Sequence, residues 1–325
     1  MREDLSRLNT SHDDGFEIFT EVCYERFDSV NSNQLKLFML DTENRLFNYP
    51  DLYIYIRSHI SRYVYNRKRI RDTENSEAKQ IQIFLDAIDH LKSVEEKDGK
   101  GKDRGAGAEL GEILLYLFLE KDLKAPKLLS KVEFKTSPDD YIKGCDAIHF
   151  RFREKSDGSK VFQIVVGEAK IYDKVLGTNG ALTRAFVSIK NYIENPKQDL
   201  RLLDSHVQNE FVDEGEARII KSYLVSSSSQ KKETVFGVFI GYTSPYSDDT
   251  VPNDTFDTEI IEKNKTYILS LKDQIISEIS KHEISNYQFN FYFLPFHNAM
   301  KDRKHIIKLL KEKQGQYYDR GRLDE

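Results

Sequence analysis

Two neighbouring apolar runs, joined by a short polar link, constrain the fold of this chain more than any other feature. Residues 144–154 read GCDAIHFRFRE, residues 160–170 read KVFQIVVGEAK, and Asp157–Gly158 lies between them. An Asp-Gly pair between alternating apolar segments is a strong signal for a tight turn that joins two antiparallel strands. The sequence therefore predicts a β-hairpin over residues 144–170.

Each arm of this hairpin carries an acidic residue on its apolar side. Side chains alternate across a strand, so Asp146 shares a face with apolar residues that follow it, and Glu168 with apolar residues that precede it. Asp146 begins the first arm and Glu168 ends the second. Both carboxylates therefore fall at the same end of the hairpin, where opposite residues pair closely. Lys170 lies two residues beyond Glu168 on the same face.

Two adjacent carboxylates at the edge of a core repel each other unless positive charge stands between them. Carboxylate oxygens are ligands that Mg²⁺ prefers, so the pair indicates a site for a divalent cation. A lysine beside such carboxylates, here Lys170, can orient a water nucleophile or stabilise a negatively charged transition state. The alternative, for each of these residues taken alone, is an ordinary solvated strand end.

A helix before the hairpin offers a third carboxylate. Residues 108–123 read AELGEILLYLFLEKDL, and their apolar side chains predict a helix that is covered on more than one side. Glu109 and Glu112 are three residues apart and share roughly one side of this helix. The sequence predicts that Glu112 joins Asp146, Glu168 and Lys170 in the active site, and it leaves Glu109 open as the metal ligand from the helix.

The pattern from residue 105 onward alternates strands and helices, which predicts an α/β fold with a mixed central β-sheet flanked by helices. The expected strands cover residues 131–136, 144–154, 160–170, 233–244 and 286–298, and the expected helices cover residues 108–123, 180–193, 258–283 and 301–313.

Residues 1–100 predict a separate, mixed but mostly helical region that contacts DNA or a partner. A strand is expected over residues 14–27, and helices over residues 32–47, 50–71 and 76–94, the last with Ser76 as its N-cap. Residues 95–107, EEKDGKGKDRGAG, are charged and rich in glycine, which is typical of a linker. We therefore predict a boundary there, before a second domain of residues 105–325.

Composition narrows the class of protein. The 325 residues contain no long apolar run, so we expect no membrane span, and the polar first residues do not read as a secretory signal. The two cysteines, Cys23 and Cys145, lie far apart, which argues against a disulfide framework or a zinc ribbon and indicates the cytoplasm. A formal net charge of −5 gives no general support for nucleic-acid binding, but it allows a local basic groove.

Two basic segments are candidate contacts for nucleic acid. Residues 57–71, RSHISRYVYNRKRIR, contain six Lys or Arg side chains, no acid and two interleaved tyrosines. Such a stretch suits phosphate contacts and base stacking, a partner interface, or a solvated helix face. Residues 178–180 predict a turn whose following helix N-terminus could hold a phosphate. The candidate nucleic-acid contacts are Arg62, Arg67, Arg69, Arg184 and Lys190.

The order of these elements resembles the PD-(D/E)xK nuclease superfamily. A helix with a glutamate, a hairpin with Asp146, the triplet Glu168-Ala169-Lys170 and a further helix follow one another from about residue 105 to 195. Gly144-Cys145 stand where the proline of the superfamily name would precede Asp146. The resemblance implies a restriction-endonuclease-like core and metal-dependent phosphodiester hydrolysis.

A closer resemblance is to the nuclease subunit of the Hachiman anti-phage defence system. It is carried by GAELGEILLYLFL, GCDAIHF and GEAKIY in this order, over most of residues 105–300. The resemblance implies an Mg²⁺-dependent DNase, with Mn²⁺ as a possible substitute, that cuts DNA with little sequence preference. It also implies a superfamily 2 helicase partner that keeps the nuclease inactive until infection or damaged DNA engages it.

Two further interpretations stay open. In the first, the chain is a non-catalytic subunit that docks a helicase or DNA on a nuclease-like fold. In the second, it is a stand-alone restriction endonuclease with discrete cuts at one sequence. The chain has no G-x-x-x-x-G-K-[ST] segment, so any ATP-driven step belongs to a partner.

Overall fold

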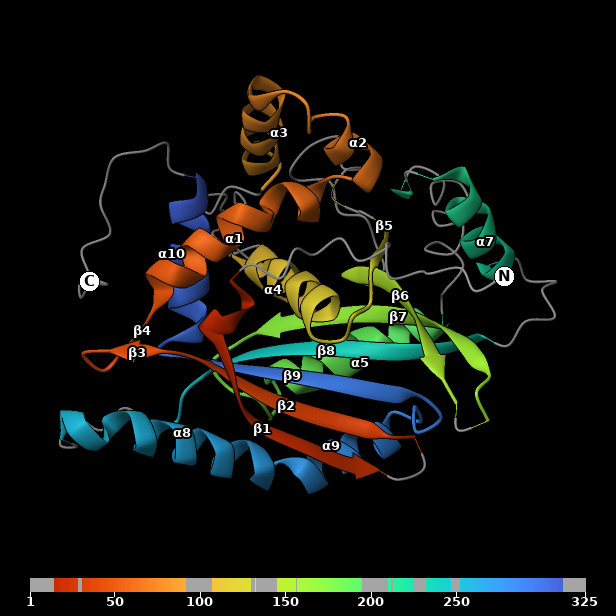
Figure 1. Ribbon diagram of the computed structural model, residues 1–325. Coiled ribbons are helices and arrows are strands. Elements are labelled where there is room, and N and C mark those ends of the chain that lie inside the picture. Colours follow the sequence, from red (N-terminus) through yellow and green to blue (C-terminus); the bar gives the residue numbers. More distant parts are fainter. Residues whose placement is uncertain are drawn as a thin grey trace, which may run out of the picture.

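The predicted hairpin lies inside a seven-stranded mixed sheet with the order β1-β2-β9-β8-β7-β6-β5 (Figure 1). The computed structural model describes residues 15–28, 31–91, 107–129, 132, 145–155, 157–194, 210–211, 213–224, 232–246 and 252–311. The strands of this sheet are β1 (Phe19–Asp28), β2 (Asn33–Leu40), β5 (Lys127–Leu129), β6 (Ala147–Glu154), β7 (Lys160–Ile171), β8 (Lys232–Thr243) and β9 (Gln288–Phe296). A two-stranded sheet pairs β3 (Thr42–Glu43) with β4 (Leu46–Phe47).

Helices cover both faces of the large sheet. They are the 3₁₀ turn Phe16–Ile18, α1 (Tyr49–Val64), α2 (Arg67–Arg71), α3 (Glu77–Asp89), α4 (Ala108–Lys121), α5 (Ala181–Glu194), α7 (Glu214–Leu224), α8 (Asn253–Ser270), α9 (Lys272–Lys281) and α10 (Ala299–Lys311). Figure 1 shows α4 on the near face with α1 above it, and α5 on the far face. No described helix is long and apolar enough to cross a membrane.

The central strands, including the second arm of the hairpin, run parallel, and the first arm, β6, runs against them. β7 pairs with β8, β8 with β9, and β9 with β2 in parallel, whereas β6 pairs with β7 and β5 with β6 in antiparallel fashion. Within the hairpin, Ala147 lies opposite Gly167 and Phe150 lies opposite Ile164. The predicted hairpin and the mixed α/β fold are therefore confirmed.

Helix α4 lies close to the sheet because glycines face it. A Cβ atom at Gly167 would lie only 2.8 Å from Leu115 Cδ2, so only glycine permits this approach without a shift of the helix. Leu115, Phe118 and the other leucine and isoleucine side chains of α4 are fully buried, as the sequence predicted for a helix covered on more than one side. This packing places the start of α4 beside the hairpin.

Strands β1 and β2 come from the region before the predicted linker, yet they complete the same sheet. β2 pairs with β9, and α1 packs against both α4 and α10. The predicted strand over residues 14–27 is confirmed as β1. The helix predicted over residues 32–47 is wrong, because these residues form β2, β3 and β4. The second half of β2, residues 37–40, is buried on both faces, and its continuous apolar run hides the alternation of a strand.

Other elements agree with the sequence in part. The helix predicted over residues 258–283 consists of two helices, α8 and α9, which meet at Leu271. Ser76 caps α3 as predicted, since its side chain accepts a hydrogen bond from the backbone N–H of Lys79. Helix α7 was not predicted. The linker at residues 95–107 and the strand at residues 131–136 lie outside the described residues, except Gly107 and Val132.

Candidate metal and active site

The hairpin brings Asp146 and Glu168 together at one edge of the sheet. The backbone N–H of Asp146 donates to the carbonyl of Gly167 at 2.9 Å, and the N–H of Ala169 donates to Asp146 Oδ2 at 2.8 Å. These bonds fix the Asp146 carboxylate against the end of β7. The position is the carboxyl end of the parallel strands, which is where open α/β sheets bind their ligands.

Glu168 is buried on the α5 side of the sheet. Its residue is only 3% exposed, and the hydroxyl of Ser188 on α5 donates a hydrogen bond to its carboxylate. The ammonium group of Lys170 donates to Glu168 Oε1 and, at 3.1 Å, to the carbonyl oxygen of Ala169. The same Nζ atom lies 4.0 Å from Asp146 Oδ2. The ammonium group of Lys170 thus lies near oxygens of three residues, Asp146, Glu168 and Ala169.

The electrostatics of this cluster are unbalanced. Burial, and then the charge of Asp146, raise the pKa of Glu168 to about 8, and these effects outweigh the opposing influence of Lys170 and Ser188. Burial alone would lower the pKa of Lys170, but the two carboxylates raise it, so the lysine stays charged. Near neutral pH the cluster therefore favours additional positive charge, either a proton or a metal ion.

The donor atoms suit a hard divalent cation. The carboxylates of Asp146 and Glu168 and the carbonyl of Ala169 are all oxygen donors, which Mg²⁺ and Mn²⁺ accept. In the part of the chain that the structure describes, no group of three or more His, Cys, Asp or Glu side chains is arranged to hold a metal ion. The residues present fit a cation held by two carboxylates, with the third carboxylate still open.

Glu109 and Glu112 lie on α4, against α1. The hydroxyl of Tyr63 on α1 donates to Glu112 Oε2 at 3.2 Å, and Glu109 is buried. Burial, then Glu112 and Glu109, and also Asp146 raise the pKa of Tyr63 well above its usual value. The buried phenol of Tyr63 is thus affected by the charges of both glutamates and of Asp146. The start of α4 therefore lies near the hairpin site, but this effect does not decide between Glu109 and Glu112.

The two candidate cations of α5 lie on different sides of that helix. Arg184 is exposed, and its guanidinium carbon lies 4.9 Å from the centre of the Tyr172 ring. Lys190 instead forms an ion pair at 3.4 Å with Glu283, beyond the end of α9. The sequence did not single out Ser188 or Tyr172, although Ser188 follows Arg184 by one helical turn, and that spacing could have revealed it.

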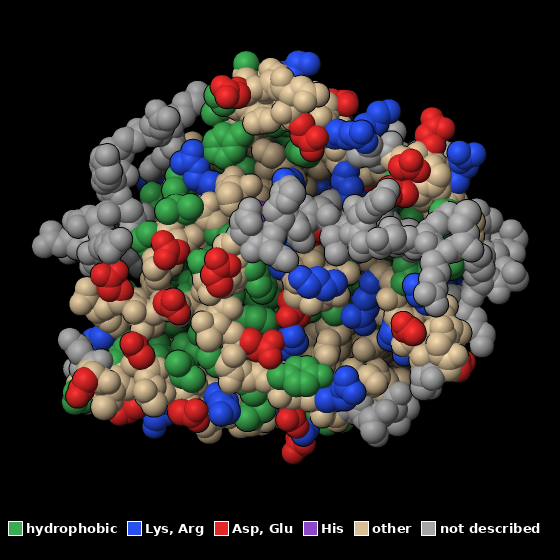
Figure 2. All heavy atoms as spheres, viewed as in Figure 1, with side chains coloured by type: hydrophobic (Ala, Val, Ile, Leu, Met, Phe, Trp, Pro, Cys, Tyr) green, Lys and Arg blue, Asp and Glu red, His purple; other side chains and the backbone are tan. Residues whose placement is uncertain are grey.

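The basic stretch 57–71 is used partly inside the protein and partly exposed. Arg67 Nη1 lies 2.7 Å from Glu210 Oε1, and the side chain is only 12% exposed, so this arginine is not open to DNA. The carbonyl of Arg62 accepts a hydrogen bond from buried Lys127. Arg69 is exposed, with its guanidinium 3.9 Å from the Tyr65 ring centre. Figure 2 shows Lys and Arg mixed with Asp and Glu on this face.

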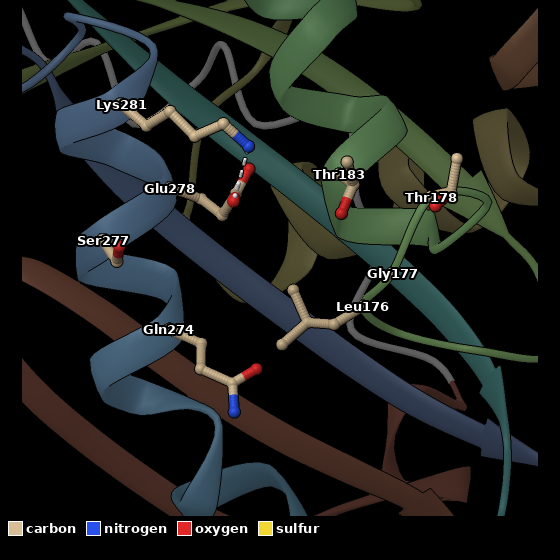
Figure 3. Close-up of a pocket in the computed structure, with 8 residues that line it drawn as sticks. All are labelled: Leu176, Gly177, Thr178, Thr183, Gln274, Ser277, Glu278 and Lys281. Carbon is tan, nitrogen blue, oxygen red and sulfur yellow. Dashed lines mark hydrogen bonds and ion pairs between the residues drawn. The ribbon is translucent and has the colours of Figure 1, made fainter.

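A pocket on the far side of the sheet lies between α5 and α9 (Figure 3). Its volume is about 570 Å³, and its walls carry the ion pair of Lys281 with Glu278 at 3.1 Å. The other lining side chains are neutral, and Thr183 of α5 faces this pocket in Figure 3. The pocket lacks a carboxylate pair like that of the hairpin, so the hairpin is the stronger candidate site.

Fold and site together define a mixed α/β protein with a pair of carboxylates, of which Glu168 is buried, and a lysine at the carboxyl end of its parallel strands. The chain belongs to the HamA family, whose sequence profile matches residues 17–310. HamA is a subunit of the Hachiman anti-phage defence system, which confirms the predicted resemblance. The match begins in the 3₁₀ turn before β1 and ends in α10. It therefore starts well before residue 105, where the predicted resemblance to the Hachiman nuclease subunit begins. No curated protein sequence matches the chain.

Proposed function

We propose that this chain is the metal-dependent DNA nuclease of its Hachiman system and acts beside a superfamily 2 helicase. The observation that carries the proposal is the placement of Lys170 among the oxygens of Asp146, Glu168 and Ala169. A structural role would favour neutral or apolar residues at this buried edge, because uncompensated buried carboxylates destabilise a fold. The order of helix, hairpin and Glu168-Ala169-Lys170 supports a PD-(D/E)xK nuclease.

Each residue has a distinct role in this proposal. Asp146 and Glu168 would hold Mg²⁺, or Mn²⁺ in its place, and the bound ion would supply Lewis-acid polarisation of the scissile phosphate. Ser188 orients the Glu168 carboxylate through its hydrogen bond. Lys170 would position the attacking water or stabilise the negative charge that develops on the phosphate oxygens. Glu112 or Glu109 would complete the set from α4.

Two features support a partner for the ATP-driven step. The chain carries no Walker A segment, so it does not supply that step through this motif. The Hachiman system implies partner proteins for its HamA subunit. The remaining exposed basic side chains of α2, at Lys68, Arg69 and Arg71, suit a contact with either the helicase or DNA. We place this assembly in the cytoplasm, where phage DNA is met.

Plasmid cleavage tests the proposal directly. The full chain, alone and with its helicase subunit, is incubated with supercoiled plasmid and Mg²⁺, and a smear of products is expected instead of discrete bands. Glu168→Gln and Lys170→Ala should each reduce cleavage by at least about a hundredfold, the scale expected when a group that stabilises the transition state is removed. Glu262→Gln and Lys281→Ala change exposed residues on α8 and α9 and serve as matched controls.

Three outcomes separate the interpretations. Cleavage that survives both Glu168→Gln and Lys170→Ala overturns the site assignment. A wild-type chain that binds the helicase or DNA without cutting under any divalent cation supports the non-catalytic docking subunit instead. Discrete fragments would support a restriction endonuclease.

A further inference from the structure

We propose that Arg184 is a phosphate anchor for the DNA strand, next to the bond that is cut. The inference rests on the proposed nuclease function and assigns the residue that holds the substrate beside Asp146, Glu168 and Lys170. We call Arg184, Tyr172 and Asn179 together the arginine anchor. Its ligand is one backbone phosphate of DNA.

The guanidinium group of Arg184 is held in place before any ligand arrives. Its Nη2 atom donates to Asn179 Oδ1 at 2.7 Å, and its Cζ atom lies 4.9 Å from the Tyr172 ring centre. Tyr172 is in turn fixed by buried Arg303, whose Cζ atom lies 5.4 Å from the same ring centre. Arg303 Nη1 donates to the carbonyl of Ile171 at 2.7 Å. The side chain of an exposed arginine is usually free to move, so the fixed position of the Arg184 guanidinium indicates a function.

Both groups that hold Arg184 are neutral. Among the described residues, its contacts are an amide oxygen and an aromatic ring, with no carboxylate at ion-pairing distance. Some other cations of the fold are paired with acids, as Arg67 is with Glu210 and Lys190 is with Glu283, whereas half-buried Arg57 rests on Tyr53 and Phe84 away from the candidate site. Within the part of the chain that the structure describes, the charge of Arg184 is therefore oriented but not compensated by an acid, which is the arrangement that suits an anionic ligand.

The arginine anchor lies beside the candidate catalytic pair. Arg184 and Ser188 are four residues apart on α5, so they lie on the same side of the helix, about 6 Å apart along its axis. Ser188 contacts Glu168 directly. Tyr172 follows Lys170 by two residues at the end of β7. The same helix face and the same strand thus carry both the anchor and the catalytic residues.

The structure also removes the competing position for a phosphate. The sequence pointed to the backbone N–H groups at the start of α5. Those of Ala181 and Leu182 already donate to the carbonyls of Lys174 and Val175, at 2.8 and 2.9 Å. The neighbouring side chain of Thr183 faces the pocket beside α9 (Figure 3). On this side of α5, phosphate recognition therefore falls to the side chain of Arg184.

Arginine suits this task better than lysine would. The planar guanidinium can present two parallel N–H groups to the oxygens of one phosphate while its face rests on an aromatic ring. A phosphate contact carries no sequence information, which agrees with cleavage at many sequences. The anchor would fix the register of the strand so that the neighbouring phosphate reaches Lys170.

DNA binding by Arg184→Gln tests the anchor. The substitution is made in a Glu168→Gln background, so that bound DNA stays intact, and binding of a fluorescein-labelled duplex is followed by anisotropy over a salt titration. We expect roughly tenfold weaker binding in low salt and a salt slope smaller by about one. Arg184→Lys keeps the charge but loses the planar guanidinium, so its DNA affinity should fall between those of the parent protein and Arg184→Gln. Arg218→Gln on α7 is the matched control, because Arg218 is another exposed arginine on a helix.

The outcomes distinguish the anchor from the nuclease proposal. Arg184→Gln that binds DNA like Arg218→Gln, with an unchanged salt slope, overturns the anchor even if the wild-type chain cuts DNA. Weaker binding by Arg184→Gln in a protein that never cuts supports the anchor and contradicts the nuclease. A full chain that binds no DNA, alone or with its helicase subunit, overturns both. In the cleaving protein, the anchor also predicts that Arg184→Gln raises KM more than it lowers kcat.

Discussion

Two clusters of charge are buried in this fold, and they are built in opposite ways. The first, which we call the buried ion cluster, consists of Arg67, Glu120, Lys127 and Glu210. Two bases face two acids there: Arg67 lies 2.7 Å from Glu210 and 3.7 Å from Glu120, and Lys127 lies 3.9 Å from Glu210. The second cluster is the candidate site, where Asp146 and Glu168 share one base, Lys170, among the residues that the structure describes.

Backbone groups add to the contrast. Lys127 Nζ donates to the carbonyls of Arg62 and Tyr65, at 2.5 and 2.8 Å, at the end of α1. A cation at this position satisfies carbonyls that have no partner within the helix and opposes the helix dipole. The buried ion cluster therefore ties α1, α2, α4 and β5 together. At the candidate site the excess over Lys170 is one carboxylate, which no other base in the described part of the chain compensates. We take that excess as the mark of function.

The largest expected effect comes from breaking the buried ion cluster. Lys127→Met removes the contacts to α1 and leaves Glu210 with less compensation, so we expect a loss of about 3–5 kcal/mol in the free energy of unfolding. Urea denaturation followed by circular dichroism measures it. Lys272→Met is the control, because Lys272 pairs with Glu25 on the surface and such pairs contribute about 0–1 kcal/mol. Equal losses in the two variants would remove the distinction between the clusters.

The contribution of Glu168 to stability should fall as pH rises, whereas that of an ordinary ion-paired carboxylate rises with pH. The folded-state pKa of Glu168 is about 8, above its ordinary value of 4.5, so folding retains a proton that the unfolded chain releases. The contribution is fully present below pH 4.5 and is lost as pH rises through 8. In metal-free buffer the wild-type stability should fall over this window, by up to about 1.4 kcal/mol per pH unit. Glu168→Gln should flatten this slope; an unchanged slope would contradict the assignment.

The pH dependence of Mg²⁺ affinity tests the same difference between the two clusters. Because Glu168 must lose its proton before it can hold a metal ion, affinity for Mg²⁺ should rise with pH, by up to about tenfold per unit below pH 8, and then level off. Calorimetry at two pH values, in buffers of different ionisation enthalpy, measures both the affinity and the proton released. Glu168→Gln should abolish the pH dependence. Binding that is independent of pH between 6 and 8 would place the cation elsewhere.

The sequence predicted the candidate site better than the buried ion cluster, and the reason is distance along the chain. Asp146 and Glu168 belong to one hairpin, so the alternation of side chains and the Asp157–Gly158 turn suffice to bring them together. Arg67 and Glu210 are 143 residues apart, and nothing local reveals that they meet. Residues 57–71, whose composition suited DNA binding, thus use Arg67 for an ion pair inside the fold.

The same limit explains the other errors. Strand β2 was predicted as a helix because both of its faces are covered, by elements that come from distant parts of the chain. The choice between Glu109 and Glu112 depends on how α4 sits against the hairpin, and helix periodicity alone does not fix that angle. By contrast, α5 could be predicted in detail, and its two cations could have been assigned to different sides from their spacing of six residues.

The smallest expected effect concerns that pair of cations on α5. Lys190→Gln breaks an exposed ion pair with Glu283, so we expect a change in stability within about 0.5 kcal/mol. Because Lys190 points toward α9, and Arg184 toward the candidate site, the same variant should alter DNA affinity by less than about twofold, with no change in salt slope. Anisotropy titrations of Lys190→Gln and Arg184→Gln, run side by side, make the comparison. A loss in Lys190→Gln as large as that in Arg184→Gln would mean that DNA contacts both sides of α5, and that the uncompensated charge of Arg184 does not mark the path of the strand.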